Sequence, residues 1–191
     1  MSEAVTALDG KRFSGLIEVE DAGLIGMVTL RADLGDAAVT KALSGAGFEV
    51  PGQRRVTGGL GGGALWMSPD ELMLLCPHGE ADALATSLTE TMSDSHAMVV
   101  NVSDARSVLR LSGEGVLIRE VLAKVSPANL RPTALPQGEV RRTRLAQVPA
   151  AFWFAGEGEA VVIAFRSVGE YVFELLSKVS EEGSAVGYFK S

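Results

Sequence analysis

The 191-residue sequence is poor in the residues on which most catalytic and metal sites depend. It contains one cysteine, Cys76, and two histidines, His78 and His96. A single cysteine cannot form an internal disulfide, which favours a reducing, cytoplasmic setting. Neither histidine has a metal-ligand spacing, and the motifs G-x-S-x-G, H-E-x-x-H and C-x-x-C are absent from the sequence. We therefore predict no catalytic, cofactor-binding or metal-ligating residue in this chain.

The few reactive side chains have structural interpretations. Asp94, Ser95 and His96 carry the groups of a hydrolase triad, but neighbouring residues of one loop cannot adopt triad geometry. His78 opens an expected helix and is interpreted as a boundary residue. Cys76 ends an apolar strand, so we interpret it as a small buried hydrophobic side chain rather than a nucleophile.

Long hydrophobic runs and an excess of positive charge are also missing. The longest apolar runs, 148–155 and 160–165, are far shorter than the roughly 20 residues that cross a bilayer. The N-terminus lacks the basic and then apolar regions of a signal peptide. A net charge of −7 argues against nucleic acid or an anionic membrane as the main partner. We expect a cytoplasmic protein that binds neither.

The apolar residues that are present follow two periodicities, which predicts an α+β fold. A first segment, 1–23, is weakly periodic and is interpreted as an extended or partly flexible arm. The expected strands are 24–31, 64–67, 71–75, 107–112, 151–154 and 160–165. The expected helices are one capped by Asp36 and stopped by Gly45 and Gly47, one over 79–92, one from Val116 to Ser126, and a last one capped by Ser167.

This order of elements occurs twice. Val28–Leu43 matches Val108–Leu122 at an offset of about 80 residues, and Trp66–Leu88 matches Trp153–Leu176. Each half is predicted as strand, helix, hairpin and helix, and a half of this kind buries only one face of its sheet. Chance similarity between two α+β segments is the alternative. The predicted divisions are the arm 1–23, a first half 24–100 and a second half 101–191, forming one compact unit.

Five of the six residues from Gly58 to Gly63 are glycine. A Walker loop needs Lys-Ser or Lys-Thr directly after its glycines, and a dinucleotide fingerprint needs a helix there. Here a strand and the turn residues Ser68-Pro69-Asp70 follow instead. We therefore predict a flexible connection into a hairpin, with a phosphate cradle as the alternative.

Basic residues cluster at Arg54-Arg55 and again at Arg141-Arg142-Thr143-Arg144. In a strand, Arg142 and Arg144 would share one face. One interpretation is a solvated face with intramolecular ion pairs, and the other is a contact for an acidic partner surface. Nucleic acid is less favoured because stacking aromatic residues are missing. We name Arg141, Arg142 and Arg144 as candidate subunit-interface residues.

Six strings are notable: Trp66–Leu75, Val99–Asp104, Val108–Gly113, Arg119–Lys124, Arg142–Pro149 and Arg166–Tyr171. They resemble the gamma subunit of heterotetrameric sarcosine oxidase, and Arg142–Val148 is the most specific part. Together they cover roughly residues 24–180. More distantly, the region resembles the folate-binding aminomethyltransferase of glycine cleavage, which implies that fold. The aminomethyltransferase has the string Asp-Val-Ser-His, and this chain has Asn-Val-Ser-Asp at positions 101–104. Asn101 thus replaces the Asp, and Asp104 replaces the His.

The resemblance implies a non-catalytic gamma subunit with alpha, beta and delta subunits as partners. Such a complex demethylates sarcosine oxidatively to glycine, reduces oxygen to hydrogen peroxide, and releases formaldehyde or 5,10-methylenetetrahydrofolate. FAD, FMN, NAD and folate belong to the alpha and beta subunits, and zinc belongs to delta. The family offers no cofactor-binding or catalytic residue to transfer to this chain. The alternatives are a free-standing folate-binding aminomethyltransferase-like protein and a nucleotide-binding module that uses the glycine run.

Overall fold

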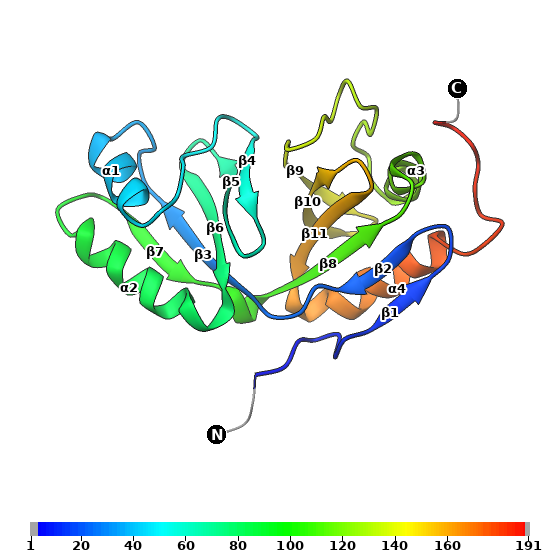
Figure 1. Ribbon diagram of the computed structural model, residues 1–191, viewed down its shortest axis with the longest axis horizontal. Coiled ribbons are helices and arrows are strands. Elements are labelled where there is room, and N and C mark those ends of the chain that lie inside the picture. Colours follow the sequence, from blue (N-terminus) through cyan, green and yellow to red (C-terminus); the bar gives the residue numbers. More distant parts are fainter. Residues whose placement is uncertain (1–3, 190–191) are drawn as a thin grey trace. The chain divides into compact units, whose positions relative to one another are not determined.

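The computed structural model describes residues 4–189 and divides the chain into two units, each built on one antiparallel sheet (Figure 1). One unit is Leu24–Ser103. The other combines the chain up to Gly23 with the chain from Asp104 onward. The first half expected from the sequence, 24–100, thus overlaps the unit Leu24–Ser103 almost completely.

The unit Leu24–Ser103 is a five-stranded sheet with two helices. Its strands follow the spatial order β4-β5-β6-β3-β7, and a short 3-10 turn, His78–Glu80, precedes its second helix. The elements are β3 (Ile25–Arg31), α1 (Ala37–Gly45), β4 (Val56–Gly59), β5 (Gly62–Ser68), β6 (Glu71–Pro77), α2 (Ala81–Thr91) and β7 (Met98–Asn101).

Helix α1 begins and ends where the sequence predicts. The side chain of Asp36 accepts a hydrogen bond from the N–H of Ala38 at 2.8 Å, which caps the helix. The helix ends at Gly45, and Gly47 has a φ of 83°, a left-handed conformation that glycine adopts without strain. Val39 and Leu43 of this helix pack with strand residues on one face of the sheet and form the core of this unit.

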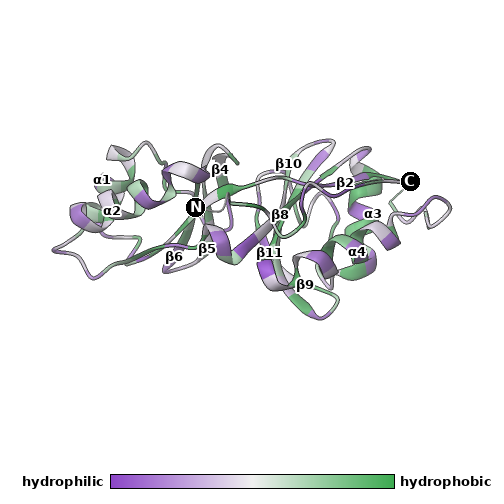
Figure 2. Cartoon of the chain, turned by 90° about the horizontal axis from the view of Figure 1, so that it is seen from below, coloured by the Kyte–Doolittle hydropathy of each residue, from purple (hydrophilic) through white to green (hydrophobic). Residues whose placement is uncertain are grey.

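The other unit is a six-stranded sheet in the order β1-β2-β8-β11-β10-β9, again with two helices. Figure 2 shows hydrophilic and hydrophobic residues alternating along the helices. In α4 the apolar positions Val172, Phe173 and Leu176 are buried in the core. The elements are β1 (Arg12–Ser14), β2 (Glu18–Asp21), β8 (Arg106–Ser112), α3 (Gly115–Val125), β9 (Arg141–Leu145), β10 (Val148–Gly156), β11 (Glu159–Phe165) and α4 (Gly169–Val179).

The two units repeat one topology, as the sequence predicts. The order β3-α1-β4-β5-β6-α2 corresponds to β8-α3-β9-β10-β11-α4, and the sheet orders β4-β5-β6-β3 and β9-β10-β11-β8 agree. The repeated order also includes a strand before each hairpin, β4 and β9. The two tryptophans are not equivalent within it. Trp66 packs against the helix-covered core of its unit, whereas Trp153 lies on the sheet face opposite to core residues Phe152 and Phe154.

Two local expectations differ from the structure. Residues 12–14 and 18–21, expected in an extended or partly flexible arm, form β1 and β2, and Val19 of β2 pairs with Leu111 of β8. The predicted cap Ser167 is wrong, because it lies inside a 3-10 turn, Arg166–Val168, and α4 begins at Gly169 without a side-chain cap.

Candidate functional site

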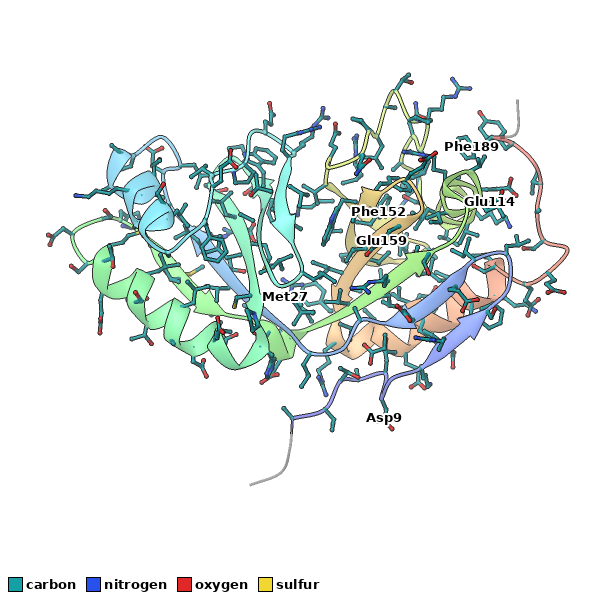
Figure 3. The ribbon with its side chains drawn as sticks, in the orientation of Figure 1. Asp9, Met27, Glu114, Phe152, Glu159 and Phe189 are labelled. Atoms are coloured by element: carbon teal, nitrogen blue, oxygen red, sulfur yellow. The ribbon has the colours of Figure 1, made fainter. Side chains whose placement is uncertain are left out.

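The three candidate interface arginines lie on β9, an edge strand of the six-stranded sheet. Arg141 is opposite Phe152, a core residue labelled in Figure 3, and cross-strand neighbours share a face of the sheet. Arg142 and Arg144 therefore lie on the other face, and both are exposed. The structure confirms that Arg142 and Arg144 share a face and separates Arg141 from them.

Arg141 is engaged within its own unit. Its Nη2 donates to the carbonyl oxygen of Ala134 at 3.0 Å and pairs with Oε1 of Glu139 at 2.8 Å. Both side chains of this ion pair are largely buried. Removing one of them would leave the charge of the other poorly solvated, which is unfavourable. Arg141 thus links the segment before β9 to the strand. Of the three candidate residues, it is the least suited to bind another subunit.

The side chain of Arg144, unlike that of Arg141, faces solvent. Its guanidinium is exposed and makes no hydrogen bond or ion pair with any residue in the described range 4–189. Arg142 is exposed beside it on the same face. A strand edge that carries two exposed guanidinium groups can bind carboxylates of another surface with bidentate geometry.

A second feature of this unit, not predicted from the sequence, is a clamp between α3 and the segment after α4. The carboxylate of Glu120 is buried, and it accepts hydrogen bonds from the backbone N–H groups of Val186 and Gly187. Lys124, one turn further along α3, donates to the carbonyl oxygens of Val179 and Ser184 at 2.9 and 2.8 Å. The two side chains hold the C-terminal segment against α3.

The electrostatics of Glu120 reflect this clamp. Burial raises the pKa of its carboxyl, but the backbone N–H donors of Val186 and Gly187 and the charge of Lys124 lower it more. The pKa of Glu120 therefore lies below its ordinary value, and the group is ionised at neutral pH. The clamp leaves Val186 and Tyr188 exposed at 75% and 64%, as part of an ordered segment.

The glycine run forms the hairpin of β4 and β5 rather than the predicted flexible connection. Gly58 pairs with Gly63 and Gly59 with Gly62. Gly58 has a φ of 68°, and a Cβ there would lie 2.1 Å from the carbonyl oxygen of Gly62. Gly63 is similarly confined, since a Cβ there would lie 2.5 Å from the carbonyl oxygen of Thr57, whereas a Cβ at Gly59, Gly61 or Gly62 meets nothing within 4 Å. Glycine is therefore required at positions 58 and 63, where the two strands approach most closely.

This hairpin also borders a cavity of about 690 Å³. A phosphate cradle would require backbone N–H groups at a helix N-terminus and a positive potential. The last glycines of the run are instead part of strand β5, and Glu49 and Glu80 line the cavity. The arrangement disfavours an anionic ligand at the glycine run.

The reactive side chains noted in the sequence have structural surroundings. Cys76 is buried, as predicted, and burial raises the pKa of its thiol, which reduces the thiolate fraction. Ser103 donates to Oδ1 of Asn101 at 2.6 Å, and the N–H of Met27 donates to Ser103 at 2.9 Å. Asn101 in turn donates to Asp82 at 2.7 Å, so this string ties β7 to β3 and α2.

Within residues 4–189, no group of three or more histidine, cysteine, aspartate or glutamate side chains is placed to hold a metal ion. None of the helices in that range is long and apolar enough to span a membrane.

Comparison with known proteins identifies the family. Residues 31–182 match the model of the sarcosine oxidase, gamma subunit family. Sarcosine oxidase subunit gamma of Corynebacterium sp. (strain P-1) is 30% identical over 90% of this chain and 84% of its own length. The subunit gamma of an Arthrobacter sp is 35% identical over 74% of this chain and 68% of its own length.

Solved structures agree with this result. A chain of heterotetrameric sarcosine oxidase from Corynebacterium sp. U-96, in complex with pyrrole 2-carboxylate, superposes with a TM-score of 0.78 and 27% identity. The superposition covers 92% of this chain and 90% of that one. Glycine cleavage system aminomethyltransferase T from Bartonella henselae has a TM-score of 0.59 at 16% identity, covering 85% of this chain and 45% of its own, which shows a shared fold. The chain therefore belongs to the sarcosine oxidase gamma subunit family.

Proposed function

We propose that this chain is a non-catalytic structural subunit of a heterotetrameric sarcosine oxidase. The observation that carries the proposal is the match over nine tenths of both chains to a chain of the Corynebacterium heterotetramer. The complex would oxidise sarcosine at its CH–NH bond with oxygen as acceptor, giving glycine, hydrogen peroxide, and formaldehyde or 5,10-methylenetetrahydrofolate. Its setting would be the cytoplasm.

The partners in this proposal are the alpha, beta and delta subunits. FAD, FMN, NAD, tetrahydrofolate and zinc would be held by those subunits. This division of labour is supported by the surroundings of the reactive side chains here. Cys76 is buried with a raised pKa, and Ser103 is hydrogen-bonded within its own unit.

The edge strand β9 is the surface that we assign to a partner subunit. Arg142 and Arg144 are exposed on one face of it, and an acidic patch on the partner would pair with them. Arg141 is not part of this contact in our proposal, because its guanidinium is bound to Glu139 and Ala134.

Purification of the tagged chain from cells that express its natural partners tests the proposal. We expect flavin-containing subunits of sarcosine oxidase to co-purify in fixed proportion, identified by peptide mass spectrometry, with sarcosine-dependent peroxide formation in the same fraction. Recovery of this chain alone, without flavin absorbance, would contradict it.

The alternative is a free-standing folate-binding aminomethyltransferase-like protein. This chain spans only 45% of the aminomethyltransferase with which it superposes. Asn101, which stands where that enzyme's string has an acidic residue, is bonded to Asp82 and Ser103. Calorimetric titration of the isolated chain with tetrahydrofolate separates the two, because only the alternative predicts heat of binding.

A further inference from the structure

A cavity of about 900 Å³ lies at the N-terminal end of α3. Its walls come from the first turn of α3, the segment 131–137, the β10–β11 turn and the C-terminal segment, where Phe189 lies beside α3 (Figure 3). The volume falls within the range of about 300–1,000 Å³ that is common for small-molecule sites. Nothing in the proposed role of this subunit uses this cavity.

Arg119 is the best-positioned charged group in the wall. Its Nη1 donates to the carbonyl oxygens of Leu130 and Leu135 at 2.7 and 3.0 Å, and its guanidinium lies 3.9 Å from the centre of the Phe154 ring. Burial lowers the pKa of Arg119, although an arginine remains charged at neutral pH. These contacts fix the plane of the guanidinium.

The same guanidinium retains unused donors. Neither Nε nor Nη2 of Arg119 donates to any residue in the described part of the chain. These two atoms form the edge of arginine that binds a carboxylate through two parallel hydrogen bonds. A fixed guanidinium with this edge unpaired is prepared for such a ligand, because little side-chain entropy remains to be lost.

The first turn of α3 adds donors to the same cavity. Glu114 does not cap the helix with its side chain, and the first turn contains no acidic residue. The N–H groups of Leu117 and Ile118 donate to the carbonyl of Glu114, whereas those of Gly115 and Val116 have no acceptor within residues 4–189. Both residues line the cavity, where the helix N-terminus contributes a partial positive charge.

The charge balance and the apolar wall define the class of ligand. Arg131 also lines the cavity and donates to the hydroxyl of Tyr188 at 3.1 Å, and Glu157 contributes one exposed carboxylate. The cavity wall thus carries two positive guanidinium groups and one negative carboxylate, and Pro132 and Phe189 add apolar surface. We propose that this cavity binds a small organic carboxylate, with the carboxylate on Arg119 and the first turn of α3 and the apolar body against Phe189.

Benzoate and its neutral analogue benzamide test the proposal on the full chain by ¹H–¹⁵N NMR. We expect benzoate to shift the Arg119 Nε–H and the amides of Gly115 and Val116, with a Kd of about 1 mM. Benzamide should bind about tenfold more weakly or worse, since it lacks the charge. Equal binding of both compounds, or benzoate shifts confined to other residues, would overturn the proposal.

Val116 offers a matched pair of variants that preserves the fold. A glutamate in the first turn of a helix is favourable for folding, but in Val116→Glu it places a negative charge in the cavity. We expect Val116→Glu to weaken benzoate binding about tenfold or more and Val116→Gln to change it about twofold at most. Val116→Glu with unchanged benzoate affinity and an unchanged amide spectrum elsewhere would show that the ligand binds outside this cavity.

Discussion

The backbone N–H of Gly187 donates to the carboxylate of Glu120 at 2.8 Å, although 67 positions separate the two residues. Glu120 is a buried acid on α3, and burial of a carboxylate is unfavourable unless donors surround it. The N–H groups of Val186 and Gly187 supply those donors. The position of the C-terminal segment is therefore set by an acid near the middle of the unit's first long helix.

Glu120→Gln should release this segment, because an amide accepts hydrogen bonds less strongly than a carboxylate and presents only one oxygen. We expect a loss of about 1–3 kcal/mol of unfolding free energy, measured by urea denaturation, and faster hydrogen exchange at Val186 and Gly187. Glu182→Gln is the matched control, since Glu182 is exposed on the same segment. Equal effects of the two substitutions would show that the clamp contributes nothing.

Acid should release the same segment in the wild-type protein. The pKa of Glu120 in the folded state lies below its ordinary value of 4.5, so its contribution is complete above that pH. The contribution is lost as the pH falls below 4.5 and through the folded pKa. The amide shifts of Val186 and Gly187 should follow this titration, and in Glu120→Gln they should be independent of pH over the same range.

The glycine hairpin should tolerate alanine at one position and not at another. Gly58→Ala introduces a Cβ 2.1 Å from a carbonyl oxygen at a positive φ, so we expect a loss of about 1–3 kcal/mol in urea denaturation. A Cβ at Gly61 meets nothing within 4 Å, and Gly61→Ala should change stability by about 0.5 kcal/mol at most. A hairpin that is only a loose connection would tolerate both.

Substitutions of the β9 arginines should have different effects: loss of Arg141 should lower stability, and loss of Arg144 should weaken binding of partner subunits. Arg141→Ala removes the ion pair to the largely buried Glu139 carboxylate and should destabilise the chain by about 2 kcal/mol. Arg144→Ala should leave the unfolding free energy unchanged. In co-purification, Arg144→Glu should weaken recovery of the partner subunits at low salt, and Arg144→Gln should weaken it less. Arg144→Glu with full recovery would remove β9 from the interface.

Local signals account for the elements that the sequence predicts correctly. Asp36 before an apolar helical pattern and Gly47 after it mark α1, and the Pro69-Asp70 turn marks the β5–β6 hairpin. Strand β2 was missed because its pairing with β8 joins Val19 to Leu111, far apart in the chain. Its four residues are too few to give a period of their own.

In the candidate site, the sequence predicts only the features that follow from the alternation of side chains between the two faces of a strand. The period of a strand places Arg142 and Arg144 together, but it does not show that Arg141 is bound to Glu139. The role of Glu120 depends on a backbone contact more than 60 positions away, for which a side-chain pattern carries no signal. The cavity at α3 likewise joins four separate segments of the chain, so only the fold brings Arg119 and Phe189 to one place.

Native mass spectrometry of the complex purified through this chain tests the central claim most directly. We predict one copy of this 20.0 kDa chain in a heterotetramer whose other members include the sarcosine oxidase subunits that carry the flavins. Dissociation in the spectrometer should release this chain without any bound cofactor. A chain that appears only as a free 20.0 kDa species, or that leaves the complex with a flavin attached, would contradict its assignment as a non-catalytic structural subunit.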